Sequence, residues 1–381
     1  MPGPAQYVSN VVQALSIKYN NVVYEMKASG EDVIVLSLGE AFFDIPLYSF
    51  DDLPFPAIYH YTHSRGVMEL RSQLADYYRS EYRVPVDPAS EIIVTPGSKI
   101  AIHMALMAIL NPGDEVLIHE PGWVSYTEQI KLCHGVPVSV PYDRTIADYR
   151  NYITPRTRAI ILNHPHNPRG SVLSDSELQS LHALAREFDL FLISDEAYSD
   201  FLDDRSFTSC GTFDPEKHHT IVCNSMSKNY GMSGWRIGYV IARPDMTDEL
   251  LKINQHLSTC PSSVLQFYIS KHFHDILEIT KPQIHEVVRT RRRLATYLDE
   301  IGLDRLPGDA TFYFFVSIAP TKLGSEEFCT RLLREHHISV VPGIGYGKSC
   351  DQFIRVSVGT ESWERVTHAL RTIKAFIVQT A

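Results

Sequence analysis

Paired cysteines, an excess of positive charge and long apolar runs are all missing from this 381-residue chain. Its six cysteines form no CxxC pair, and a chain of this length needs no disulfide framework, so we expect reduced thiols. The formal net charge of -10 disfavours nucleic acid and anionic membranes as partners. No apolar run approaches the roughly eighteen residues of a membrane span, and the first residues do not resemble a secretion signal. A cytoplasmic protein is therefore predicted.

Metal-type spacing of histidine and cysteine is also absent, so we predict no metal site. One strong basic cluster is present, in the segment RTRRR, and it lies in a long helical stretch. Charge runs of this kind usually mark a solvated helix face, which is what we expect here. The cluster consists of Arg289, Arg291, Arg292 and Arg293.

Short apolar runs alternate with helical segments through the first two thirds of the chain, a pattern typical of βαβ units and a parallel sheet. Between two of these runs, Ser174 and Glu177 form a capping box before an apolar stripe, which predicts a crossover helix. With 44% hydrophobic residues, the chain is long enough for one large core and a smaller one. The predicted strands are 91–95, 115–119, 158–163, 190–194 and 220–225.

The pattern changes after about residue 265. A long helical stretch is followed by three apolar segments, at 311–318, 337–341 and 353–359. These segments predict a smaller α+β domain.

The segment SMSKNYGMSGWRIGY and the upstream SDEAYSDF together contain the polar groups that pyridoxal phosphate needs. Lys228 can form a Schiff base with an aldehyde cofactor, and Ser225, Ser227 and Arg236 are near enough in sequence to hold a phosphate. Asp195 ends an apolar strand, where a carboxylate would face the crevice of an open α/β sheet and pair with a protonated pyridine nitrogen. The sequence therefore predicts this cofactor.

A second phosphate contact is predicted where PGSK joins a strand to a helix. The N–H groups of Gly97, Ser98 and Lys99 would point from the helix N-terminus toward an anion. Taken alone, GSK is better explained as a simple strand–helix turn. Beside the lysine segment, the phosphate site is the better interpretation.

The order of these motifs resembles the class I/II aminotransferases of fold type I, the aspartate aminotransferase superfamily, which depend on pyridoxal phosphate. The resemblance begins at about residue 10 and reaches the C-terminus. Its motifs are LSLGE with Gly39, the YT…G segment from Tyr61 to Gly66, PGSK, PGW with Trp123, NPRG with Asn167, SDEAY with Asp195 and Tyr198, SMSK with Lys228, GWR with Arg236, and FIRVSVG with Arg355.

The resemblance implies an α/β fold with a large, mostly parallel sheet flanked by helices and a smaller α+β domain. We expect residues 45–275 to form the large cofactor-binding domain, and residues 1–44 with 276–381 to form the small one. It also implies a homodimer with shared active sites, in which Tyr61 reaches the phosphate of the neighbouring subunit.

The resemblance also implies roles for single residues. Lys228, Asp195 and Tyr198 would be catalytic, and Tyr198 with Asn167 would hydrogen-bond the ring oxygen. Trp123 would stack on the ring; alternatively it is an aromatic buried under a loop. Gly39, Asn167 and Arg355 would bind the substrate carboxylate, although Arg355 could instead be an exposed strand arginine. The expected cofactor contacts are Gly97, Ser98, Lys99, Trp123, Asn167, Asp195, Tyr198, Ser225, Ser227, Lys228, Arg236 and the partner's Tyr61.

Some positions depart from the usual pattern. In GEAFFDIP, Ala41, Phe42 and Phe43 replace a polar turn, which favours an apolar substrate side chain slightly. Several polar side chains near the motifs either act in proton transfer, contact an acidic side chain or are ordinary loop residues. They are His60, His63, His164, His166, Arg65 and Arg169, and no role is assigned to Tyr7 or Tyr126.

Three functions fit these observations. The favoured one is transfer of the amino group of an L-amino acid to a 2-oxo acid, through a Schiff base on Lys228 and the pyridoxamine form of the cofactor. The second is another reaction on the same scaffold, either elimination of the C–S lyase type or oxygen-dependent oxidation. The third is a binding module without catalysis, which would have lost Lys228, Asp195 or Arg236, and all three are present.

Overall fold

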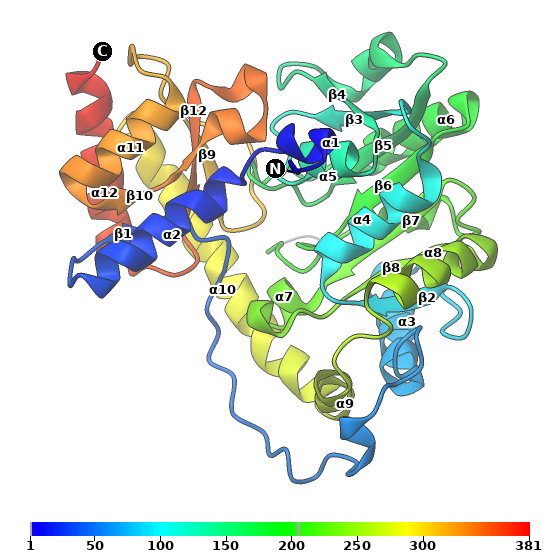
Figure 1. The fold of residues 1–381 in the computed structure, drawn as a ribbon. Coiled ribbons are helices and arrows are strands. Elements are labelled where there is room, and N and C mark those ends of the chain that lie inside the picture. Colours follow the sequence, from blue (N-terminus) through cyan, green and yellow to red (C-terminus); the bar gives the residue numbers. More distant parts are fainter. Residues whose placement is uncertain (1, 204–205) are drawn as a thin grey trace.

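A computed structural model describes residues 2–203 and 206–381. Its central feature is a seven-stranded sheet with the order β2-β8-β7-β6-β5-β3-β4 (Figure 1). The strands from β7 to β4 run parallel, whereas β8 is antiparallel to both neighbours. Their bounds are β2 Ile92–Thr95, β3 Glu115–His119, β4 Val136–Val140, β5 Thr157–Asn163, β6 Phe191–Asp195, β7 Thr220–Ser225 and β8 Gly238–Ile241.

Helices cover both faces of this sheet, which explains why its strands are apolar on both sides. One face packs against α4 (Ser98–Ile109), α5 (Tyr126–Leu132) and α8 (Pro244–Leu257). On the other face, α6 (Asp175–Phe188) packs on β3, β5 and β6. Helices α3 (Met68–Tyr82), α9 (Ser263–Lys271) and the start of α10 (Phe273–Glu300) form a third cluster beside β2 and β8.

The C-terminal part forms the second lobe of Figure 1. An antiparallel sheet has the order β11-β12-β9, and a two-stranded parallel sheet pairs β1 with β10. These strands share a core with the second half of α10 and with three further helices. The elements are α2 Leu15–Ala28, β1 Ile34–Val35, β9 Tyr313–Ser317, α11 Ser325–His336, β10 Ile338–Ser339, β11 Val341–Pro342, β12 Phe353–Ser357 and α12 Trp363–Gln379.

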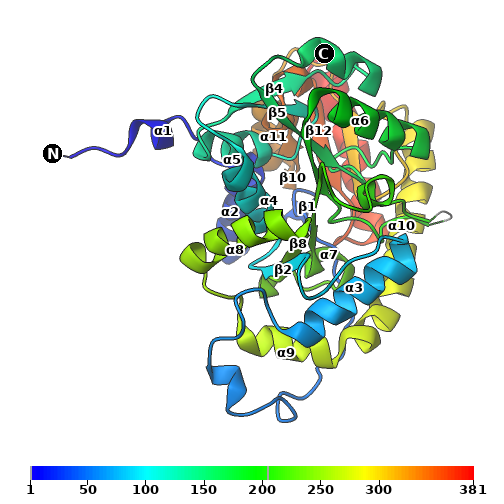
Figure 2. The ribbon, with the colours of Figure 1, turned by 90° about the vertical axis from the view of Figure 1, so that its right-hand side faces the viewer.

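The N-terminal segment connects the two lobes. Figure 2 shows α1 (Gln6–Ser9) reaching away from the body of the molecule. The following residues return toward α5, where the Val12 amide donates to the Glu128 carboxylate at 3.0 Å. The chain therefore contacts the large sheet domain before α2 enters the core of the smaller lobe.

The five expected strands of the large sheet are all present, and the capping box of Ser174 and Glu177 begins α6 as predicted. Two strands were not predicted. Strand β4 contains Pro137, which is tolerated because β4 lies at the sheet edge. Strand β8 is short and follows the GWR turn directly.

The expectation of a solvated arginine face on α10 is wrong at one position. Arg291 is only 1% exposed and donates to the carbonyl oxygens of Tyr313 at 2.9 Å and Gly308 at 2.8 Å. A buried guanidinium needs such acceptors, which Gly308 and the first residue of β9 supply. The side chains of Arg289 and Arg292 are half-exposed and lie near Asp203.

Candidate active site

A cavity of about 500 Å³ lies between the carboxyl ends of the parallel strands and the smaller lobe. Its walls come from distant parts of the chain, including α2, the start of α4, the end of β6, α7 (Met226–Asn229) and β12. Parallel strands bring their carboxyl ends to one edge, which is where open α/β sheets bind ligands. The predicted site residues that line it are Gly39, Ser98, Lys99, Trp123, Asn167, Asp195, Tyr198, Ser225, Ser227, Lys228, Arg236 and Arg355.

Asp195 is the last residue of β6 and is 6% exposed. The Tyr126 hydroxyl donates to its carboxylate at 2.6 Å, and the Ala197 amide donates at 3.3 Å. Burial raises the pKa of Asp195 to about 6, and these donors act in the opposite direction. An opposite charge placed beside this carboxylate would therefore be bound tightly.

Lys228 lies on the short helix α7, on the same cavity wall. Its ammonium donates to the Gly39 carbonyl oxygen and lies 5.6 Å from the centre of the Tyr198 ring. Burial lowers the pKa of Lys228 to about 8, the Glu40 carboxylate opposes this shift, and Arg355 adds to it. The neutral amine is therefore far more populated near neutral pH than it is in a free lysine.

A chain of hydrogen bonds connects the large sheet domain to β12. The side-chain NH₂ of Asn167 donates to the Tyr198 hydroxyl at 3.4 Å, and the hydroxyls of Tyr198 and Tyr313 lie 2.8 Å apart. Arg355 donates to the Asn167 side-chain oxygen at 3.4 Å and to the Ser37 carbonyl at 2.6 Å. Its Nε is buried without a partner among the described residues. Arg355 is 3% exposed, so the alternative of an exposed strand arginine is wrong.

The opposite end of the cavity is built for an anion. The amides of Ser98 and Lys99 begin α4 and have no backbone acceptor in the part of the chain that the structure describes. The Gly97 amide does not join them as expected, because it donates to the Thr95 carbonyl at 2.7 Å. Arg236 lies beside this turn, where a Cβ on Gly97 would come within 2.4 Å of its Nη2.

Serine hydroxyls complete this end. Ser225 caps α7 by accepting from the Ser227 amide at 3.0 Å, and Arg236 donates to the Ser227 hydroxyl at 3.3 Å. Two open amides, an arginine, a lysine and hydroxyls fit a phosphate. Farther along the cavity, the half-buried Lys228 fits an aldehyde and the buried Asp195 fits a pyridine nitrogen. The residues present therefore fit pyridoxal phosphate.

Comparison with known proteins agrees with this geometry. The model of the family described as aminotransferase class I and II matches residues 50–373. The chain belongs to this family.

Individual aminotransferases are similar over nearly the whole chain. An aspartate aminotransferase of Pyrococcus abyssi is 34% identical, covering 91% of this chain and 92% of that protein. An aromatic-amino-acid aminotransferase of Thermococcus litoralis is 31% identical over 91% and 92% of the two chains. The solved aspartate aminotransferase of Thermus thermophilus with maleate superposes with a TM-score of 0.89 at 30% identity, covering both chains completely.

The protein is therefore a fold-type-I aminotransferase that uses pyridoxal phosphate and acts on an amino acid and a 2-oxo acid. None of its described helices combines the length and apolar content needed to cross a bilayer. Among the described residues, no group of three or more histidine, cysteine, aspartate or glutamate side chains is arranged to hold a metal ion.

Several highlighted residues lie outside the aminotransferase cavity. Tyr61 is 86% exposed and, with His60, lines a different surface hollow. The ring of His164 bonds the Thr208 carbonyl and the Leu173 amide, so it is a satisfied loop residue. Arg65 pairs with Asp248. His166 and Arg169 line a second cavity. Phe42 is 65% exposed, and neither it nor Ala41, Phe43 or His63 lines the cavity.

Sequence reasoning also missed residues that the cavity contains. Glu40 accepts a hydrogen bond from Ser233 at 2.7 Å, and Tyr313 contacts both Tyr198 and Arg355. The position of Glu40, next to Gly39, was a usable signal. Tyr313 was not identifiable, because it stands among three phenylalanines in the apolar segment 311–318. The remaining lining residues are Ser16, Ile17, Asn20, Leu38, Asn163 and Ala197.

Proposed function

We propose that amino-group transfer takes place in this cavity, with Lys228 as the proton carrier, Asp195 as the partner of the cofactor ring and Arg355 as the binder of the substrate carboxylate. The observation that carries this proposal is the convergence of these three side chains on one cavity, from three distant segments. Asp195 and Arg355 are buried and Lys228 is half-buried, and each has unused capacity for a ligand, which is unusual for a purely structural group.

Pyridoxal phosphate supplies an aldehyde carbon and an electron-withdrawing ring. Asp195 would hold the ring nitrogen in its protonated form, and Tyr126 fixes the carboxylate in place through the 2.6 Å hydrogen bond. Tyr198 and Asn167 would donate to the ring oxygen from the opposite edge. Trp123, which lines the same cavity and packs against Tyr126, would cover one face of the ring.

Lys228 would move the proton that transamination requires. With the pKa of its amine lowered to about 8, the neutral form can accept a proton from the substrate α-carbon and return it at a second carbon. The nearby carbonyl oxygen of Gly39 holds the protonated form in position. Proton transfer therefore needs no other base in the cavity.

Arg355 would fix the substrate by its carboxylate. Its Nε has no partner among the residues that the structure describes, and its guanidinium lies 4.6 Å from the centre of the Tyr313 ring, which limits its movement. A carboxylate held in one plane also fixes the direction of the α-carbon bonds. This orientation favours loss of the α-hydrogen over loss of the carboxylate.

The charges of the cavity point to a substrate with an uncharged side chain. The described cations that line it are Lys99, Lys228, Arg236 and Arg355. Two of these are proposed for the phosphate, one for proton transfer and one for the α-carboxylate. Within one chain, none remains for a second substrate carboxylate.

A homodimer with shared sites is part of the proposal. Large apolar side chains are exposed along the segment 42–61, which ends at Tyr61. Exposed apolar side chains gathered in one segment are typical of a surface that another protein chain covers. Mixing inactive Lys228→Ala protomers with inactive Tyr61→Phe protomers would restore activity in hybrid dimers if the site is shared. The exposed residues are Phe42 (65%), Leu47 (87%), Phe55 (52%), Tyr59 (73%) and Tyr61 (86%).

We retain the division into a large domain at 45–275 and a small domain at 1–44 with 276–381. The separate sheets and cores support it. A cytoplasmic location is supported by the six free cysteines, five of them buried. Fluorescent tagging and fractionation would test that location.

The decisive experiment is visible absorption of the holoenzyme while single amino acids are added without an acceptor. We expect an amino acid to abolish the cofactor band and a 2-oxo acid to restore it. Recovery without an oxo acid, with release of ammonia or uptake of oxygen, would instead support elimination or oxidation.

A further inference from the structure

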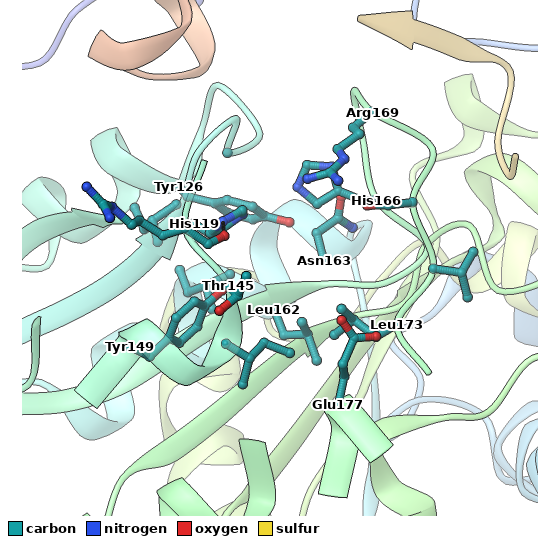
Figure 3. Close-up of a pocket in the computed structure, with 17 residues that line it drawn as sticks. His119, Tyr126, Thr145, Tyr149, Leu162, Asn163, His166, Arg169, Leu173 and Glu177 are labelled. Carbon is teal, nitrogen blue, oxygen red and sulfur yellow. Dashed lines mark hydrogen bonds between the residues drawn. The ribbon is translucent and has the colours of Figure 1, made fainter. Parts of the chain in front are cut away.

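A second cavity, of about 270 Å³, shares the lining residue Asn163 with the aminotransferase cavity (Figure 3). It is formed by the ends of β3 and β5, the 3-10 turn Ile146–Tyr152, the loop after Asn163 and the start of α6. Drug-sized ligands occupy pockets of about 300–1,000 Å³, so this volume suits a smaller molecule.

The two sides of this cavity carry different side chains. In Figure 3, Tyr149, Leu162 and Leu173 lie on one side together with Glu177, whereas His166 and Arg169 lie on the other. Burial lowers the pKa of His166 to about 3 and also lowers the pKa of His119, so both rings are neutral near neutral pH. The charged lining groups are then Arg144, Arg169 and Glu177.

Arg169 and Glu177 carry opposite charges but do not pair. The Arg169 Nε donates to the Pro307 carbonyl at 3.0 Å, and none of the described ion pairs includes this residue. One oxygen of Glu177 accepts from the amide and hydroxyl of Ser174, both at 2.8 Å. Burial lowers the pKa of Arg169, and the charge of Glu177 opposes that effect. Figure 3 shows them on opposite sides of the cavity.

This arrangement selects among ligand charges. A simple anion would meet Glu177, and a simple cation would meet both arginines. A zwitterion can satisfy both ends, and the apolar wall would receive an uncharged body. We propose that this cavity is a second binding site, for a free amino acid with an apolar side chain, whose carboxylate binds Arg169 and whose ammonium binds Glu177.

A ligand bound in this second cavity would affect the aminotransferase site. Asn163 lines both cavities. Its side-chain NH₂ donates to the backbone carbonyl of Asp195 at 3.0 Å, and its side-chain oxygen accepts from the backbone amide of Asn167 at 2.6 Å. Arg169 reaches the smaller lobe through Pro307. A ligand here therefore contacts groups that position both Asp195 and the substrate side of the cavity.

Calorimetric titration of the holoenzyme with α-methyl-leucine tests the proposal, because this amino acid lacks the α-hydrogen and cannot be transaminated. We expect two molecules to bind per protomer. Arg169→Gln and Glu177→Gln should each weaken one of the two by about tenfold or more. Binding near Lys228 should still change the visible absorption in both variants, so failure of the second site is distinguished from failure of the first.

The helix cap provides a matched control. Gln at the third helical position can replace Glu in a capping box, so Glu177→Gln removes the charge and keeps α6 intact. Ser174→Ala keeps the charge of Glu177 but weakens the helix cap. It should therefore lower the stability of the protein without changing the affinity of the second site. Binding of 4-methylpentanoate or 3-methylbutylamine, which lack one charge each, should be weaker than that of α-methyl-leucine.

A single binding event in the wild-type protein, or two events that survive both charge-removing variants, would overturn the proposal. Equal binding of 4-methylpentanoate at the second site would overturn the role of Glu177.

Discussion

Asp195 and Glu196 are consecutive buried carboxyl groups at the end of β6, yet their surroundings differ sharply. Asp195 faces the cavity and receives one side-chain donor, Tyr126, and one amide. Glu196 is 0% exposed and points away from it. Its donors are Ser194 at 3.0 Å, Ser209 at 2.9 Å, the Cys210 amide at 2.9 Å and Tyr78 at 3.4 Å.

The comparison shows that a buried carboxyl group can be either fully hydrogen-bonded or left open for a further partner. Burial raises the pKa of Asp195 to about 6 and that of Glu196 to about 7, so both carboxylates are costly to ionise. The fold surrounds Glu196 with donors, which makes it a structural junction between β6, α3 and the turn Cys210–Phe213. Asp195 is left with room for one more partner. An incompletely satisfied carboxylate beside a lysine is what a cationic ring nitrogen requires.

The largest effect on activity is expected for a substitution in the aminotransferase cavity, on the Asp195 side of the comparison. Lys228→Ala removes the proposed proton carrier, and we expect kcat to fall by about 10⁴-fold or more. Stopped-flow measurement of the half-reaction checks this, after residual wild-type protein has been removed. Wild-type rates in this variant would show that proton transfer takes place elsewhere. Tyr78→Phe, on the Glu196 side, is the matched control and should keep kcat within about threefold.

Exchanging each carboxylate for its amide tests the comparison directly. Asp195→Asn removes the charge that would bind the ring nitrogen, so cofactor affinity should fall by about 100-fold, as expected for a lost buried charge pair. Glu196→Gln should change that affinity by less than about tenfold. Equilibrium dialysis against pyridoxal phosphate measures both. Equal losses would mean that Glu196 also acts on the cofactor.

Stability of the cofactor-free protein should show the opposite order. A carboxyl group whose folded pKa is raised keeps its proton longer in the folded state, so its contribution to stability falls as pH rises from about 4 toward 6 or 7. Asp195→Asn removes this loss, and should be more stable than wild type at pH 8 by on the order of 2 kcal/mol, but not at pH 4.

Glu196→Gln is expected to destabilise the same cofactor-free protein, by about 1–3 kcal/mol, because an amide N–H then faces hydroxyl and amide donors. Urea unfolding at both pH values compares the two variants. Destabilisation of both would show that Asp195 has a structural role as well.

Much of this arrangement could be predicted from the sequence, because the strand before Asp195 and the segment around Lys228 carry local signals. Strand alternation alone also indicates that Asp195 and Glu196 point to opposite faces. The donors could not be predicted, since Tyr78 and Ser209 come from distant segments. Arg291 was misjudged for a similar reason: its acceptors belong to another part of the chain. Local patterns indicate elements and motifs, whereas burial depends on packing between them.

Tyr126→Phe should have the smallest effect. The hydroxyl lowers the pKa of Asp195 by donating to it at 2.6 Å, so its loss makes the carboxylate harder to ionise and easier to displace. We expect cofactor affinity to fall by about tenfold, the value of one hydrogen bond to a charged group. The pH below which the cofactor dissociates should rise, because Asp195 then takes up a proton at higher pH. Following cofactor fluorescence during acid titration measures that shift. An unchanged midpoint would show that Asp195 needs no donor from Tyr126, and the contrast with the four donors of Glu196 would then be greater still.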